Sequence, residues 1–303
     1  MLTEVGAILI KLEDPAGAEV VTDQAVYVEN LAINPTGEFI ERAGRGAFHG
    51  PEMTGVIGGR SGKCTFSTEM RTSGSQAFDA GLAILLQACN FVKTLEVYTI
   101  AKIATQKTIT IEVWQDGVLK VLYGAAGTFT IDYATNQRVM FNFDFDGLYK
   151  AEADEAVPAY VPAGTTMMFG DGSFTVLTES HMISKFTFDA GNVVVPKYDI
   201  TGPGGITYYQ TTYPKPIVSW DPESALVATD DVHADWLAGT TGTLALAVGN
   251  GTDKVTLDCG KVQYMEIPEG ARDNIRIHEV TAQCLETHAT VPTMAKLTVA
   301  SDA

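Results

Sequence analysis

The clearest pattern of hydrophobic and polar positions lies between residues 107 and 149. In KTITIEVW, residues 107–114, isoleucine and valine alternate with threonine and glutamate, the two-residue period of a half-buried strand. Asp116-Gly117 follows and can supply the positive φ angles of a tight turn. The runs VLKVLY, TFTIDY and RVMFNFDF repeat the alternation, and the glycines of residues 124–127 indicate another turn. We therefore predict a meander of four antiparallel strands.

The last of these strands has two chemically different faces. Phe141, Phe143 and Phe145 alternate with one asparagine and two aspartates, so the phenylalanines share a face. The sequence predicts a sheet that is apolar on one side and polar and acidic on the other.

A similar order of strands and turns returns between residues 242 and 284. GTLALAV, KVTLDC, VQYMEI and NIRIHEVTAQC are separated by residues 249–251, 260–261 and 268–270, which are rich in glycine. We expect a mainly β fold with a few short helices (α+β). It would comprise two duplicated domains of β-sandwich or barrel type, residues 1–160 and 161–303, joined by a linker within residues 152–172.

One amphipathic helix is predicted in each domain. AFDAGLAILLQACNF, residues 77–91, places leucines three and four residues apart, and this helix should close the first core against the meander. DDVHADWLAG, residues 231–239 and the acid before them, is a shorter helix with Gly239 as its expected C-cap.

A glycine-rich connection, residues 43–62, separates the strands predicted near residues 38–42 and 63–70. Between residues 42 and 71 the chain carries five bases and two acids, within a protein whose net charge is −17. The segment is either a solvated loop or a cationic arm that docks on the acidic surface of another copy. The residues of such a contact between subunits or rings would be Arg42, Arg45, His49, Glu52, Arg60 and Lys63.

Bulk composition narrows the class of protein. The chain has 303 residues, 46% of them hydrophobic, which suits a folded protein with a sizeable core. No apolar run is long enough for a membrane span, and the N-terminus has no secretion signal, so we expect synthesis in the cytoplasm. No cationic patch could neutralise a run of phosphates, which argues against tight binding to nucleic acid.

Catalytic and metal-binding patterns are missing from the sequence. The five histidines have no metal-ligand spacing, and the four cysteines form no C-x-x-C pair. Asp144-Phe145-Asp146-Gly147 is similar to part of a calcium loop but lacks the later ligands. We predict no catalytic, cofactor or metal residues and no enzyme activity; carboxylate chemistry in a cleft is the alternative that the sequence leaves open.

Two stretches resemble a known family. Residues 41–91, with a long glycine-bearing loop, G-x-x-G-x-x-S-G and a helix ending L-L-x-A-C-x-F, and residues 184–225 are similar to the tail tube (major tail) proteins of long-tailed bacteriophages, the larger two-domain type. The resemblance implies stacked rings whose sheets join into one β-barrel around a channel for the genomic DNA. It also implies a place in the virion tail, assembly in the host cytoplasm, and tape-measure and tail terminator proteins as partners.

Many members of that family carry one such unit and form six-fold rings. A chain with two units would give a homotrimer ring with pseudo-hexamer symmetry. A lumen of the same sign as DNA would let it pass without specific binding. The residues expected to face the lumen are Thr110, Glu112, Thr130, Asp132, Asn142, Asp144, Asp146 and Asp258.

The alternative is a two-domain β-sandwich that binds a glycan or decorates a virion or cell surface. Aromatic residues in loops, Tyr208, Tyr209, Tyr213 and Trp236, would suit sugar stacking, although filling of the core and of interfaces is their commoner role.

Overall fold

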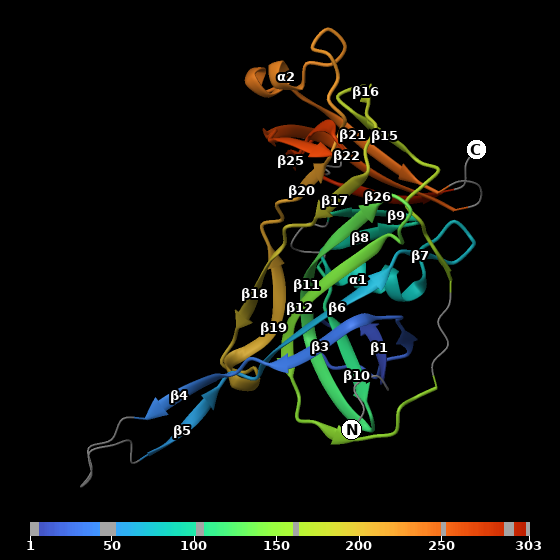
Figure 1. Ribbon diagram of the computed structural model, residues 1–303. Coiled ribbons are helices and arrows are strands. Elements are labelled where there is room, and N and C mark those ends of the chain that lie inside the picture. The colour runs from blue at the N-terminus through green and yellow to red at the C-terminus, as the bar shows by residue number, and fades with distance from the viewer. Residues whose placement is uncertain are drawn as a thin grey trace.

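The computed structural model describes residues 6–42, 53–100, 106–159, 164–249, 253–287 and 294–300. The fold is mainly β, with 58% strand and 7% helix. Figure 1 shows an elongated molecule built around two long neighbouring strands. These are β11 (Val118–Ala134) and β12 (Met140–Tyr149), which pair antiparallel along most of β12.

The meander differs from the predicted one in its middle turn. The turn at Asp116-Gly117 is confirmed, with φ angles of 47° and 87°. Residues 124–127, however, do not turn, because β11 runs through them with only a shift of register between Tyr123 and Ala126. Gly124 takes a φ of 57°, so the extra residues bulge out of the ladder and the strand continues. There are three strands here, not four.

The sheet of the first half is assembled around this hairpin. In spatial order its strands are β2 (Gln24–Ala25), β1 (Gly6–Leu12), β10 (Ile109–Gln115), β11, β12, β6 (Ser61–Glu69) and β3 (Glu29–Pro35).

The same sheet continues into the second half of the chain. The C-terminal end of β11, beyond the part that pairs with β10, pairs with β17 from Thr130↔Asp189 to Ala134↔Lys185. From there the strands are β17 (Lys185–Asp189), β20 (Ile217–Trp220), β25 (Val280–Cys284) and β22 (Lys254–Glu266). The turn predicted at residues 260–261 is wrong, since β22 passes through it as a bulged strand.

Further strands extend both edges of β22. One edge carries β21 (Thr241–Val248), β15 (Ser173–Val176) and β16 (Glu179–Ser180). The other carries β26 (Lys296–Ala300), β9 (Val97–Ile100) and β8 (Phe91–Thr94). Within the main sheet, strands of the first half thus pair with strands of the second at β11–β17 and at β9–β26.

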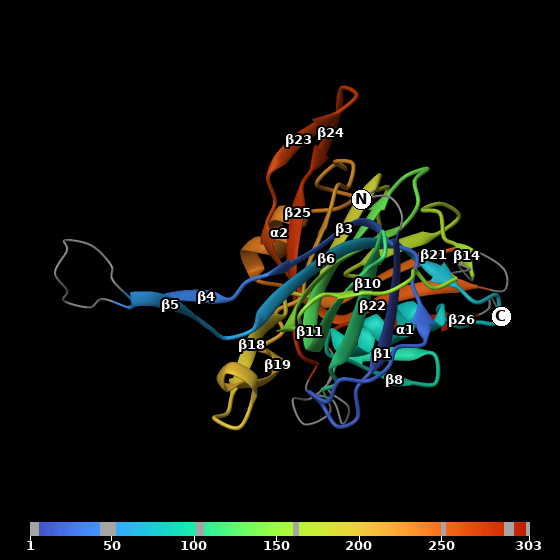
Figure 2. The same ribbon diagram turned by 90° about the horizontal axis from the view of Figure 1, so that it is seen from below.

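Short ribbons lie outside the main sheet. They are β4 (Glu38–Arg42) with β5 (Met53–Gly58), β18 (Val193–Tyr198) with β19 (Ile206–Thr212) around the 3₁₀ turn η2 (Pro203–Gly205), β23 (Glu269–Arg272) with β24 (Ile275–His278), and β7 (Arg71–Thr72) with β14 (Thr165–Thr166). A short strand, β13 (Ala153–Asp154), pairs with the start of β11. The β4–β5 and β23–β24 hairpins project from the body of the molecule (Figure 2). Residues 53–58, predicted as loop, are therefore strand, whereas residues 43–52 lie outside the described residues.

Phenylalanines fill the core beneath the central sheet. Phe129 contacts Phe141 and Phe143 with ring centroids 5.6 Å apart, and it also contacts Phe188 of β17 at 5.9 Å. Tyr133 meets Phe186 edge to face at 5.6 Å. One continuous cluster of buried side chains consequently runs through both halves of the chain.

The two α-helices among the described residues have different surroundings. α1 (Ala80–Ala88) is largely buried against the core, as predicted. α2 (Val232–Ala238) starts after Asp231, whose side chain accepts a hydrogen bond from the Ala234 amide, and ends at Gly239 with a φ of 64°, the predicted C-cap. Only Val232 of α2 is buried, so this helix lies at the surface and is less enclosed than α1.

Candidate assembly surfaces

One face of the central sheet is polar from β6 to β22. Residues that oppose one another across the ladders share a face, and the pairs Ser67↔Asn142, Asn142↔Thr130 and Thr130↔Asp189 start this row. It continues through Asp132↔Thr187, Thr187↔Ser219, Ser219↔Thr281 and Gln283↔Gln263. The opposite face at the same positions is the buried core. We call the row from Ser67 to Gln263 the polar face.

Ion pairs and hydrogen bonds tie neighbouring strands together on the polar face. Lys63 Nζ lies 2.7 Å from Asp144 Oδ2, and this bond raises the pKa of Lys63. Burial raises the pKa of Asp146, against the opposing effect of Lys63. Asn142 donates to Asp132 at 2.7 Å. Asp132, Asn142, Asp144 and Asp146 thus lie together beside Thr130, as the sequence predicted, and all are at least partly exposed.

Two predicted lumen residues are covered by the chain itself. Thr110 is fully buried, because Glu13 and the backbone of Val20 lie over it. Glu112 is half-buried and accepts a hydrogen bond from Thr22. Both do lie on the side of the sheet opposite the core, but residues 13–22 close that end. For Thr110 an exposed position is therefore excluded in this chain.

Glu13 is the buried acid that holds this covering segment in place. Its carboxylate accepts from Thr108 Oγ1 at 2.5 Å, Thr110 Oγ1 at 2.8 Å, the Gly17 amide at 2.8 Å and the Gly124 amide at 2.7 Å. Sequence reasoning missed it, since EDPAG is typical of an exposed loop. The bulge at Gly124 turns an amide out of the ladder, and that amide binds the carboxylate.

The β18–β19 hairpin covers another part of the same side. A small apolar cluster joins it to the central strands through Ala126, Leu148, Ile206 and Tyr209. Asp258, the predicted lumen residue of the second half, lies on the part of β22 that pairs with β26 and forms an ion pair with Lys296 at 3.1 Å. It is thus separated along β22 from Gln263 of the polar face.

The outermost strands of the polar face, β3 and β22, differ in what lies beside them. Among the described residues, β3 pairs only with β6, so its other edge is open. At the far margin α2 lies against β22, where Trp236 Nε1 donates to the Met265 carbonyl at 3.0 Å and Gln263 Nε2 donates to the Gly239 carbonyl at 3.3 Å. An open edge strand is a template for pairing with another chain.

The β4–β5 hairpin, which we call the arm, is the most exposed apolar element. Phe39 is 61% exposed and Ile57 71%, and Ile40, Met53 and Val56 are exposed as well. The Phe39 ring lies on Gly55, where a Cβ atom would come within 2.1 Å of it. A lone two-stranded ribbon is marginally stable in water, and exposed apolar surfaces of this kind are typical of protein contact sites.

The predicted contact residues of this region divide into three groups. Arg42 ends β4 and Arg60 follows β5, and both are exposed. Lys63 does not belong to the arm, because it lies on β6 and pairs with Asp144. Arg45, His49 and Glu52 fall outside the described residues. The exposed apolar side chains of the arm, which the charge pattern did not reveal, are its main feature.

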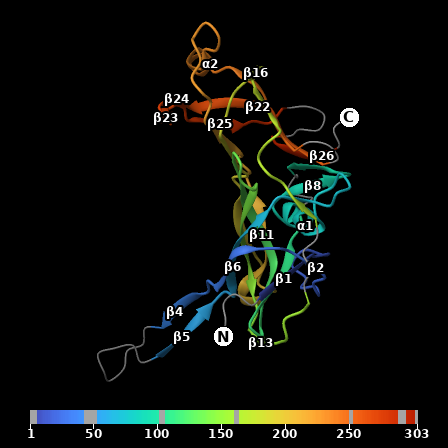
Figure 3. The same ribbon diagram turned by 45° about the vertical axis from the view of Figure 1, so that its right-hand side comes forward.

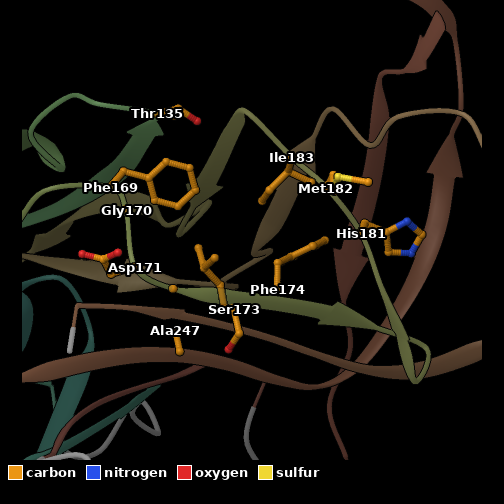
Figure 4. Close-up of a pocket in the computed structure, with 12 residues that line it drawn as sticks. Thr135, Phe169, Gly170, Asp171, Ser173, Phe174, His181, Met182, Ile183 and Ala247 are labelled. Atoms are coloured by element: carbon orange, nitrogen blue, oxygen red, sulfur yellow. The ribbon is translucent and has the colours of Figure 1, made fainter. Parts of the chain in front are cut away.

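An open cavity of about 310 Å³ lies beside the second-half sheet. Phe169, Phe174 and Ile183 line it, with Asp171 and His181 near its rim (Figure 4). His181 Nδ1 is 3.6 Å from Asp230, and burial lowers the pKa of this histidine despite that carboxylate. Among the described residues, no serine, threonine or cysteine side chain is hydrogen-bonded to His181.

Metal and thiol chemistry find little support in the described part of the chain. No group of three or more His, Cys, Asp or Glu side chains there could hold a metal ion. The four cysteines are free and buried. The Sγ atoms of Cys259 and Cys284 are 3.0 Å apart, and Cys284 donates a hydrogen bond to Cys259. This hydrogen bond is the largest cause, and burial the second, that raises the pKa of Cys259 well above its usual value.

The aromatic residues considered for sugar stacking do not form one site. Tyr209 is buried and its hydroxyl donates to Ser61 at 2.7 Å, whereas neighbouring Tyr208 holds Lys197 Nζ at 2.8 Å. Tyr213 is exposed near the end of β19, and Trp236 lies on α2 at the far end of the molecule (Figure 1).

Comparison of the sequence with protein-family models and with curated proteins gives no match. Within the described residues, none of the helices has the length and hydrophobicity needed to cross a bilayer.

Proposed function

We propose that the protein is a structural virion protein that polymerises as stacked rings into the tail tube of a long-tailed bacteriophage and forms the channel for genomic DNA. The observation that carries this proposal is the polar face, which runs unbroken across both halves of the chain while the other side of the same sheet is core. A sheet with one solvent-exposed polar face and one unpaired edge strand suits the wall of a channel.

Three copies are the expected ring. β17 follows β10 along one edge of β11, whereas β25 and β26 share the edge of β22 opposite β21. In each half, however, a hairpin leads into a long strand that is bulged near a glycine, β11 at Gly124 and β22 at Gly260. This likeness supports the duplication and hence pseudo-hexamer symmetry. Each chain would contribute the row of strands from β3 to β22. The open edge of β3 is the margin at which a neighbouring copy would join, since β22 is paired with β21 on one edge and with β25 and β26 on the other.

Charge on the polar face suits passage of a polyanion. Lys63 and Lys185 on this face are each paired, Lys63 with Asp144 and Lys185 with Glu279 at 3.5 Å. Asp146 shares Lys63 with Asp144, and Asp132 and Asp189 add negative charge without a salt bridge to a lysine or arginine among the described residues. Walls of this sign repel phosphates within a Debye length of about 8 Å at physiological salt, so DNA would not adhere. Tape-measure and terminator proteins would then meet the interior and the end of the tube.

Electron microscopy of the purified full-length chain tests the proposal. We expect negatively stained tubes or rings whose class averages show three-fold symmetry with six similar lobes. Mass photometry should give a ring of three chains. Monomers that never associate over a range of concentration and salt would refute the proposal, and six-fold rings of six chains would refute its stoichiometry.

The cavity beside β15 supports a second candidate, a binding or decoration module. It is lined mainly by aromatic and aliphatic side chains with a few polar groups, which is usual for small-ligand sites. Specific binding to a glycan array by a chain that remains monomeric would favour this function over the tube.

A further inference from the structure

We propose that Cys259 and Cys284 form an oxidation site at which a small peroxide closes a disulfide bond between β22 and β25. The two thiols would stay reduced inside a cell and become linked in oxidising surroundings, where disulfides persist. Such a bond would form within one chain, whether or not copies assemble.

A bulge in β22 brings Cys259 onto the same face as Val262. On β21 a single residue, Thr243, stands opposite residues 260–261. Positions three apart in a regular strand point to opposite faces, but the extra residue of the bulge turns both Cys259 and Val262 into the core, where they are fully buried.

Cys284 on the neighbouring strand lies against Cys259. β22 and β25 run side by side at one end of the molecule (Figure 3). Cys284 pairs with Val262 across this ladder, and its Sγ atom donates a hydrogen bond to the Sγ atom of Cys259 over 3.0 Å. A disulfide bond is about 2.05 Å long, so the two sulfur atoms need to approach each other by only about 1 Å.

The oxidation takes two steps. The sulfur of one thiol attacks an oxygen atom of hydrogen peroxide, the O–O bond breaks, and a sulfenic acid and one water molecule form. The sulfur of the second thiol then displaces the hydroxyl group, so that the S–S bond forms, the S–O bond breaks and a second water molecule leaves. The two thiols together lose two electrons and two protons, which reduce the peroxide to water.

Proximity distinguishes this pair from the other two cysteines. Cys64 on β6 and Cys89 at the end of α1 are buried too, and burial raises the pKa of both thiols. Since the pKa of Cys259 is also raised, thiolates are scarce at neutral pH and oxidation should be slow. Among the described residues, however, Cys259 and Cys284 are the one pair of cysteines joined by a hydrogen bond, so a sulfenic acid on either sulfur has a thiol beside it.

A disulfide at this place would fasten the point where β22 changes partners. The part of β22 before Cys259 pairs with β26, and the part after residues 260–261 pairs with β25. The two cysteines are 25 residues apart in the sequence, and the segment between them includes the β23–β24 hairpin. Closing this loop restricts the unfolded chain, so the thermal midpoint of the linked protein should be higher by about 5 °C.

Oxidation of the purified full-length protein tests the site. The reduced protein is treated with hydrogen peroxide in mildly alkaline buffer, the remaining thiols are alkylated after denaturation, and the digest is analysed by mass spectrometry. We expect linked peptides that contain Cys259 and Cys284 together with the rise in thermal midpoint, and both should disappear after reduction with dithiothreitol.

Two variants complete the test. Cys284→Ala removes the second thiol, so the oxidised variant should carry a sulfinic acid at Cys259 and be no more stable than its reduced form. Cys64→Ala, the matched control, removes a buried cysteine elsewhere and should keep both the linked peptides and the rise in midpoint.

The proposal would be overturned if Cys259 and Cys284 of the unaltered protein resisted peroxide, were oxidised without being linked, or became linked to Cys64 or Cys89 in equal yield. A link that left the thermal midpoint unchanged would overturn its stabilising role. None of these outcomes depends on whether tubes form, so the site and the proposed function can fail separately.

Discussion

Glu13 shows how one residue fixes a long segment of the chain. Its carboxylate receives hydrogen bonds from two threonine hydroxyls and two amides, and it holds residues 13–22 over β10. We expect Glu13→Ala to lower the free energy of unfolding by about 3 kcal/mol, because several buried donors lose their acceptor at once. Urea denaturation followed by circular dichroism measures this change.

Glu19→Ala is the matched control for that variant. Glu19 is in the same segment but forms an exposed ion pair with Lys150, so its loss should cost less than about 1 kcal/mol. Equal losses for the two variants would contradict the role given to Glu13.

The ionisation of Asp221 should make the stability of the fold depend on pH. Burial is the largest single effect on this carboxyl group and opposes its ionisation. The hydrogen bonds from Ser184 and Lys185 and the Arg272 guanidinium at 2.6 Å nevertheless together hold the pKa below its ordinary value. Since the folded pKa is below the unfolded value of about 3.9, this stabilisation is complete above about pH 5 and is lost as the pH falls through the folded pKa.

The variant Asp221→Asn should therefore be less stable than the parent by about 2–3 kcal/mol at pH 7, and the difference should shrink towards pH 3. Guanidinium titrations at both pH values measure it. Asp154→Asn, an exposed position on β13, should change stability by less than about 0.5 kcal/mol at either pH. A difference for Asp221→Asn that stayed constant with pH would show that charge is not the cause.

At the scale of elements, the arm should matter for assembly and not for folding. Its apolar side chains are mostly exposed, and Phe39 covers only Gly55 of the same hairpin, so Phe39→Ser with Ile57→Ser removes little burial from the body of the chain. We expect the free energy of unfolding of the unassembled protein to change by less than about 0.5 kcal/mol, while tubes disappear from negative-stain images. The control is Val218→Ser in β20, a fully buried site, which should unfold the chain before it affects assembly.

Alternation of apolar and polar residues located most strands because a half-buried strand has that period whatever its neighbours are. The strands around residues 107–114 and 63–70 and the C-cap of α2 followed from such local signals. The turns predicted at residues 124–127 and 260–261 failed for one reason. Glycine permits a turn and a bulge equally, and the choice depends on which distant strands offer partners on both sides.

The candidate surfaces were predictable only in part. The acids of β12 and β11 share a face because of strand geometry alone, so Asp132, Asp144 and their neighbours were found. What covers a face comes from remote segments, and no local pattern indicated that residues 13–22 would bury Thr110. The apolar surface of the arm was hidden in the sequence because exposed and buried strands have the same alternation.

At the scale of the whole molecule, the two halves should unfold together. β17 is hydrogen-bonded to the end of β11, and Phe129 of the first half contacts Phe188 of the second, so separating the halves would break a shared core. We expect one calorimetric transition, and Phe129→Ala should destabilise the entire chain by about 3–5 kcal/mol.

Tryptophans in the two halves provide the measurement. Trp114 on β10 and Trp220 on β20 report on different ends of the joined sheet. The variant Trp220→Phe retains Trp114 and the exposed Trp236 as fluorophores, and Trp114→Phe retains Trp220 and Trp236. In a urea titration the two fluorescence curves should share a midpoint, and Phe129→Ala should move both by the same amount. Separate midpoints would mean that the halves are independent domains. The polar face would then consist of two separate sheets, one in each half, that only touch. A ring of three chains would in that case lack the rigid connection between the two units of each chain.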